Sequence, residues 1–206
     1  MVLYHGPMVP RVDLPEEAPD LTATQLHNEV GVRLYDVLRF LFAGRATVIY
    51  DIFVRVDETT QVAPDLLIVH EAPHELRRVY RIPPDPVPDV TIEVLSPLND
   101  RAFGRRKLEQ KRALLGAIGV PVHLELDPDR GRITTWHNIG AELVPGPPSD
   151  RYDGDHLAGL RIELSPGQVR FWLPDGREYV DAADESARAD RLAEALRAAG
   201  IDPDSV

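Results

Sequence analysis

Two helical patterns of hydrophobic residues divide the chain. From Thr24, a suitable N-cap, apolar residues recur at helical spacing until Gly44, which predicts a long core helix. A second helical pattern covers residues 104–118 and ends at Gly119, a common residue just past a helix end. The apolar positions of the first pattern are Leu26, Val30, Leu34, Val37, Leu38, Leu41 and Phe42.

Apolar runs of strand length lie between and after these helices, bounded by polar or proline-rich connections. Three of them separate the two helices, at residues 46–56, 64–69 and 89–95, and a fourth follows at residues 120–126. The order helix, three strands, helix, strand predicts an α/β fold in which helices flank a mixed β-sheet.

The last third of the chain changes character. Short strand patterns occur at residues 133–137, 160–164 and 169–172, and prolines interrupt the stretch between the first two. We therefore expect extra C-terminal strands at a sheet edge or in an outer layer. Residues 184–199 are rich in alanine and leucine and precede Gly200, which predicts a terminal docking helix.

The same patterns predict the domain organisation. Residues 1–20 hold prolines among acidic residues and show no hydrophobic period, which predicts a flexible N-terminal arm. Residues 21–175 contain the expected sheet and its two core helices, so we expect one main domain there. Residues 176–206 are then a C-terminal helical extension.

The charge of the chain restricts its partners. The formal net charge of 206 residues is −11, which excludes a broad DNA-coating function because such binding needs an extended basic surface. One local basic cluster stands out, and it is either a nucleic-acid-binding stripe or a solvated helix face. The cluster consists of Arg101, Arg105, Arg106, Lys107, Lys111 and Arg112.

Composition excludes several other classes. The chain has no cysteine, so it can form neither a disulfide framework nor a thiolate metal site. No apolar stretch approaches the roughly 20 residues that span a bilayer, and no signal peptide pattern opens the chain. We expect a cytoplasmic protein.

Two carboxylates occur in apolar strand patterns. Asp65 stands at the start of the run 64–69, and Glu93 lies inside the run 89–95, where strand alternation places it on one face with Thr91. A buried carboxylate is costly unless it is paired or binds a cation. A structural glutamate with a charged partner would satisfy this requirement, and so would a Mg²⁺ site, since Mg²⁺ prefers oxygen ligands.

The only two lysines of the chain, Lys107 and Lys111, follow in the second predicted helix. A helical wheel places both with the apolar residues on the sheet-facing side, whereas the neighbouring arginines fall on the opposite side and should face water. A lysine that points at two carboxylates would suit a site that needs a cation for the transition state. Long lysine side chains also extend from apolar faces to solvent, and this alternative stays open.

The segment His70–His74 matches the H-E-x-x-H string of zinc peptidases. That motif needs both histidines on one face of a continuous helix, and Pro73 interrupts any such helix. We interpret the segment as a charged loop.

Three sequence elements together resemble a known family. They are Pro64–Val69, the Ile92–Pro97 string Ile-Glu-Val-Leu-Ser-Pro, and Lys111 eight residues before Gly119-Val120-Pro121. They resemble the Uma-two family of restriction endonucleases, within the PD-(D/E)xK nuclease superfamily, over roughly residues 24–165. The resemblance implies a restriction-endonuclease-like core, Mg²⁺ dependence with Mn²⁺ as a substitute, DNA as substrate and a homodimer, for which the last helix is a candidate contact.

The resemblance also implies roles for individual residues. Asp65 and Glu93 would be Mg²⁺ ligands, aided by the backbone carbonyl of Val94, and Lys111 would stabilise the developing negative charge or orient the attacking water. Lys107 could substitute for Lys111. His27 stands where the family often has a histidine and is a candidate accessory residue.

The chain departs from the family pattern at several positions. Leu95 occupies the place of the usual superfamily lysine, a replacement typical of this family, whose lysine lies on the following helix. Leu115 stands where a tyrosine is common, and Val122-His123 replaces a Glu-Tyr type of pair. These departures keep two alternatives open: a non-catalytic binding or regulatory protein that retains the nuclease fold, and a metal-dependent hydrolase that acts on something other than DNA.

Overall fold

The computed structural model describes residues 25–70, 78–198 and 202. The predicted N-terminal arm, the N-cap Thr24 and most of the H-E-x-x-H segment lie outside these ranges.

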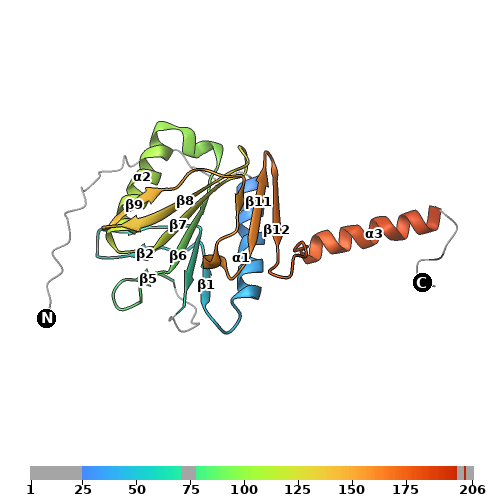
Figure 1. Ribbon diagram of the computed structural model, residues 1–206, viewed down its shortest axis with the longest axis horizontal. Coiled ribbons are helices and arrows are strands. Elements are labelled where there is room, and N and C mark those ends of the chain that lie inside the picture. Colours follow the sequence, from blue (N-terminus) through green and yellow to red (C-terminus); the bar gives the residue numbers. More distant parts are fainter. Residues whose placement is uncertain (1–24, 71–77, 199–201, 203–206) are drawn as a thin grey trace.

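The main sheet has six strands in the order β1-β4-β6-β7-β8-β9, and Figure 1 shows it at the centre of the molecule. The pairing of β6 with β7 is parallel and the other pairings are antiparallel, which confirms the predicted mixed sheet. The strands are β1 Thr47–Tyr50, β4 Leu66–Val69, β6 Val90–Val94, β7 Val122–Asp127, β8 Arg132–Ile139 and β9 Glu142–Pro145.

Two small three-stranded sheets accompany it. One contains β10 Arg151–Tyr152, β11 Arg161–Ser165 and β12 Gln168–Trp172, and the other β2 Val54–Arg55, β3 Gln61–Val62 and β5 Tyr80–Arg81. The prediction of one strand over residues 46–56 is wrong, because β1 and β2 belong to different sheets. Between them Asp51 adopts a φ of 47°, in the left-handed region that ends an extended run.

Three α-helices are present in the described part of the chain: α1 Gln25–Leu41, α2 Ala102–Ala117 and α3 Ala182–Ala198. Short 3-10 turns occur at η1 Pro97–Asp100 and η2 Asp155–Leu157. The two predicted core helices are confirmed, and Gly44, with a φ of 70°, follows the end of α1.

The two faces of the main sheet are covered by different elements. α1 and the β10–β12 sheet pack on one face and enclose a continuous apolar core that includes Leu34, Ile92 and Phe171. On the other face lie α2 and the β2–β3–β5 sheet, where a smaller apolar cluster surrounds Leu67 and Tyr80. The strands thus separate a large apolar layer from a second layer that has room for polar residues.

The last helix does not dock on the main domain as predicted. Figure 1 shows α3 extending away from the sheets, and Leu192 on it is 61% exposed. An ion pair of 3.2 Å between Arg33 Nε and Asp181 Oδ2 joins the segment before α3 to α1. No helix within the described ranges is long and apolar enough to cross a bilayer.

Candidate active site

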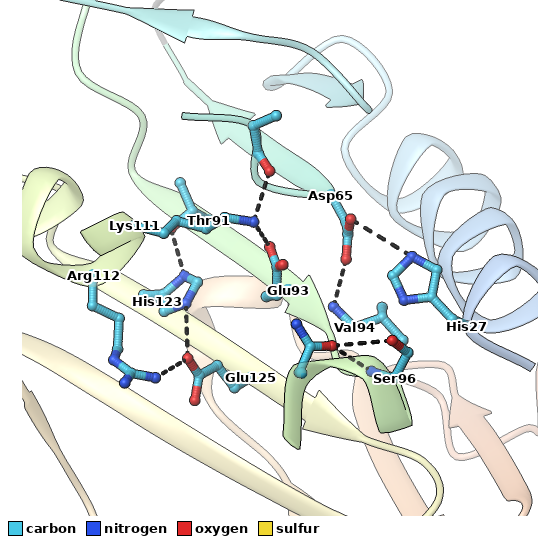
Figure 2. Close-up of polar contacts among 12 residues, drawn as sticks. His27, Asp65, Thr91, Glu93, Val94, Ser96, Lys111, Arg112, His123 and Glu125 are labelled. Atoms are coloured by element: carbon cyan, nitrogen blue, oxygen red, sulfur yellow. Dashed lines mark hydrogen bonds and ion pairs between the residues drawn. The ribbon is translucent and has the colours of Figure 1, made fainter. Parts of the chain in front are cut away.

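The register of two strands brings the two predicted carboxylates together. β4 and β6 are antiparallel with Leu66 opposite Ile92, so Asp65, one residue before β4, stands opposite Glu93. The Val94 N–H donates a hydrogen bond of 2.7 Å to Asp65 Oδ2, which fixes this carboxylate against the end of β6. Figure 2 shows the two carboxylates side by side, together with His27 of α1 and Lys111 of α2.

Lys111 of α2 reaches this pair as predicted. Its ammonium donates hydrogen bonds to Glu93 Oε2 and, at 2.7 Å, to the carbonyl oxygen of Ala63. The side chains of Lys111 and Glu93 are 14% and 8% exposed, so the ion pair is largely removed from solvent. Anchoring by Ala63 places the ammonium beside the segment that carries Asp65.

His27 enters the site from α1. Its Nε2 lies 3.7 Å from Asp65 Oδ1, and its side chain is 15% exposed. Burial lowers the pKa of His27, and the backbone of Val94 and the charge of Glu93 oppose this by favouring the protonated ring. The structure therefore places the predicted accessory histidine at the carboxylates, while its role stays a prediction.

The helical-wheel prediction is right for Lys111 and wrong for two of its neighbours. Lys107 is exposed, and its ammonium lies 4.7 Å from the centroid of the Phe103 ring instead of at the carboxylates. Arg112, predicted to face water, points toward the sheet, where its Nη1 donates a hydrogen bond of 2.6 Å to Glu125 Oε1. The side of α2 that faces the sheet therefore includes Lys111 and Arg112 but not Lys107.

The ionised forms of the two carboxylates are disfavoured in the folded protein. Burial raises the pKa of Asp65 to about 6, although the charge of Lys111 and the Val94 N–H both act to lower it. Burial likewise raises the pKa of Glu93; Lys111 opposes the shift and the charge of Asp65 adds to it. Partly buried Asp65 and buried Glu93 lie near a single ammonium, that of Lys111, so the ionised site has one negative charge in excess.

Asp65 and Glu93 fit a magnesium ion that retains several of its water ligands. No group of three or more histidine, aspartate or glutamate side chains gathers as a ready-made metal site among the described residues. Mg²⁺, however, is commonly held by one or two carboxylates together with waters and substrate phosphates. The excess negative charge of Asp65 and Glu93 favours such a cation, and each carboxylate has an oxygen beyond the one that binds Val94 or Lys111.

A second polar network lies next to the site, and sequence reasoning missed it. His123 and Glu125 of β7 are 0% and 6% exposed, and they point to the same face of the sheet as Glu93. Strand alternation in Val122–Asp127 could have placed both on one face. What the sequence could not supply is the parallel register that sets Glu125 beside Glu93.

Comparison with solved structures shows the class of fold. The crystal structure of a putative nuclease of the DUF820 family from Anabaena variabilis matches with a TM-score of 0.53 and 17% sequence identity, covering 69% of this chain and 79% of that chain. The predicted restriction-endonuclease-like α/β fold is therefore confirmed.

Comparison with family models gives the family. The model described as "Uma2: Putative restriction endonuclease" matches residues 17–165. The chain belongs to the Uma2 family, as its motifs indicated, and this membership supports a nuclease function. No curated protein matches the chain.

Proposed function

We propose that this protein is a Mg²⁺-dependent endonuclease that hydrolyses phosphodiester bonds of DNA. The observation that carries the proposal is the convergence of Asp65, just before β4, Glu93 of β6 and Lys111 of α2 in a largely buried cluster of a nuclease-family fold.

The metal would be held by the carboxylates of Asp65 and Glu93 and by the carbonyl oxygen of Val94. When bound, Mg²⁺ would lower the pKa of a coordinated water and polarise the scissile phosphate. The Val94 N–H holds Asp65 in one orientation, since it fixes Oδ2 at 2.7 Å.

Lys111 would stabilise the negative charge that develops on the phosphate. The Ala63 carbonyl and Glu93 hold its ammonium in place, so little reorganisation is needed when the charge appears. His27, whose Nε2 lies 3.7 Å from Asp65 Oδ1, would help to orient this carboxylate.

Nuclease assays with matched lysine variants test the proposal. The protein is incubated with Mg²⁺ or Mn²⁺ and with single- and double-stranded DNA, beside Glu93→Ala, Lys111→Ala and the control Lys107→Ala. Loss of a preorganised transition-state contact lowers rates by about 10²–10³-fold, and we expect at least this loss for Glu93→Ala and Lys111→Ala. Lys107→Ala should cleave at close to the wild-type rate, because Lys107 is exposed and lies over Phe103.

Several outcomes would contradict the proposal. Cleavage that is unchanged in both site variants would exclude this site, and binding of DNA without cleavage would favour the non-catalytic alternative. Hydrolysis of another phosphodiester but not of DNA would support the other alternative, a metal-dependent hydrolase that acts on something other than DNA. The homodimer stays a prediction, which light scattering on the purified protein would test.

A further inference from the structure

A second ion pair lies beside the pair formed by Lys111 and Glu93. Residues 111 and 112 are consecutive in α2, and Glu93 and Glu125 are direct partners in the parallel pairing of β6 with β7. Lys111 binds Glu93, and Arg112 binds Glu125 at 2.6 Å. Two neighbouring residues of one helix are thus tied to two neighbouring strands.

The second ion pair, formed by Arg112 and Glu125, is largely buried. The side chain of Glu125 is 7% exposed, and the guanidinium carbon of Arg112 lies 4.4 Å from the centroid of the Trp136 ring on β8. A guanidinium over an indole ring is a favourable contact. Arg112 is therefore held both by a carboxylate and by an aromatic face.

His123 connects this pair back to the strand of Glu93. Its Nε2 lies 3.6 Å from Glu125 Oε1, and its Nδ1 lies 2.9 Å from Thr91 Oγ1. Thr91 precedes Glu93 by two residues on β6 and faces the same side. The contacts close a ring that runs from Glu93 through α2, across β7 and back to β6, as Figure 2 shows.

This ring matters for Lys111 because the contacts with Ala63 and Glu93 fix its ammonium but not the helix backbone from which its side chain extends. An ammonium on a four-carbon chain is a flexible point charge, whereas the guanidinium of arginine is a rigid planar fork. Consecutive residues of a helix differ by about 100° around its axis, so contacts at both positions resist rotation and sliding of the helix. Fixing Arg112 therefore fixes the backbone from which Lys111 extends.

We propose that Arg112, Glu125 and His123 are positioning residues that set Lys111 against Glu93 in the nuclease site. The proposal rests on the proposed function for its catalytic consequence, and the placement of Lys111 can be measured without any activity. None of the three residues needs to touch the substrate.

The outer sheet offers a matched control. Arg161 stacks on Trp172 with its guanidinium carbon 4.6 Å from the ring centroid, and its Nε lies 3.3 Å from Glu163 Oε1. This second arginine–glutamate–tryptophan cluster lies on β11 and β12, away from α2. Arg161→Met therefore removes the same kinds of contact as Arg112→Met without touching the support of Lys111.

The first experiment uses metal-free protein and NMR of lysine labelled with ¹³C. The chain has two lysines, so Lys111→Ala assigns both sets of signals. Arg112→Met and Glu125→Gln should shift and broaden the Lys111 signals and leave those of Lys107 unchanged, and Arg161→Met should change neither. Unchanged Lys111 signals in folded Arg112→Met would overturn the proposal.

The second experiment measures cleavage in two backgrounds. A misplacement of about 1 Å can cost up to about 100-fold, so Arg112→Met should lower kcat about 10-fold to 100-fold with little change in KM. In the Lys111→Ala background the same substitution should have no further effect. An equal loss in both backgrounds would mean a general structural role and would overturn the proposal.

A double variant keeps the test valid if the single variants unfold. Removing one partner of a buried ion pair leaves an unpaired charge, which Arg112→Met/Glu125→Met avoids. This variant should fold, perturb the Lys111 signals and lower kcat; unperturbed signals would overturn the proposal. Absence of cleavage by the wild-type protein would refute the proposed function alone, because the NMR result stands independently.

Discussion

The two faces of strand β6 in the main sheet have opposite chemistry. In β6, Ile92 and Val94 point into the apolar core under α1, and the residues between and before them, Thr91 and Glu93, point toward α2. All four are buried, with exposures between 0% and 6%. The difference between the faces is therefore one of polarity and not of burial.

The comparison shows where stability and function are placed in this fold. Burial of the apolar face stabilises the protein, since removing hydrocarbon from water is favourable. On the polar face, burial instead raises the pKa values of Asp65 and Glu93 and opposes their ionisation. Burial on the apolar face thus offsets the loss of stability caused by the ionised carboxylates on the polar face. Substitutions on the two faces should therefore change stability in different ways.

The largest effect on stability is expected on the apolar face. Ile92→Ala removes a fully buried side chain from the core and should lower the free energy of unfolding by about 2–5 kcal/mol. Guanidinium unfolding followed by circular dichroism measures this loss. The control Ile139→Ala changes a side chain that is 64% exposed and should cost within about 0.5 kcal/mol. Equal small losses for both would mean that α1 does not pack on the sheet as described.

The apolar face is also the part of the structure that the sequence predicted best. The helical spacing of Val30, Leu34 and Leu38 follows from burial alone, as do the apolar runs of β4 and β6, and their residues on the α1 side all lie in the large core. Local periodicity carries this information because each element needs only one buried face.

The polar face was predicted only in part, since its partners depend on register and on helix rotation. Asp65 and Glu93 stood out as acids within apolar runs, and the match to the family selected Lys111. Arg112 was noted only as part of a basic cluster and predicted to face water, and Glu125 was not singled out, because a glutamate in an alternating strand is ordinary in sequence. Their contact with each other is visible only in the folded structure, where α2 packs on the parallel pair of β6 and β7.

A smaller effect, dependent on pH, is expected on the polar face. In the unfolded chain an aspartate releases its proton near 3.8, but folded Asp65 retains it until about pH 6. Between these values the folded state binds more protons, so the free energy of unfolding of metal-free protein falls as the pH rises. Asp65→Asn removes this dependence and should be more stable than the wild type above pH 6, by about 3 kcal/mol.

Unfolding curves at pH 4 and pH 7.5, recorded with chelator, test this difference. Asp57→Asn is the control, because hydrogen bonds from Thr59 and Thr60 lower the pKa of Asp57 below 3.8. The contribution of Asp57 to stability is lost only at pH values below this window, so its gap to the wild type should change little between pH 4 and pH 7.5. A stability gap between wild type and Asp65→Asn that does not grow with pH would contradict the burial of an ionised Asp65.

The smallest effect on stability is expected when a polar side chain of the polar face is replaced by an apolar one of the same shape. Thr91→Val keeps the shape of the side chain and removes the hydroxyl that lies 2.9 Å from His123 Nδ1. The loss of one buried hydrogen bond should lower the free energy of unfolding by about 1 kcal/mol, measured by urea unfolding. Imidazole ¹⁵N NMR should show a changed environment of His123, whose ring is fully buried. If neither the free energy of unfolding nor the His123 signals change, the hydrogen bond between Thr91 and His123 does not stabilise the polar face of β6.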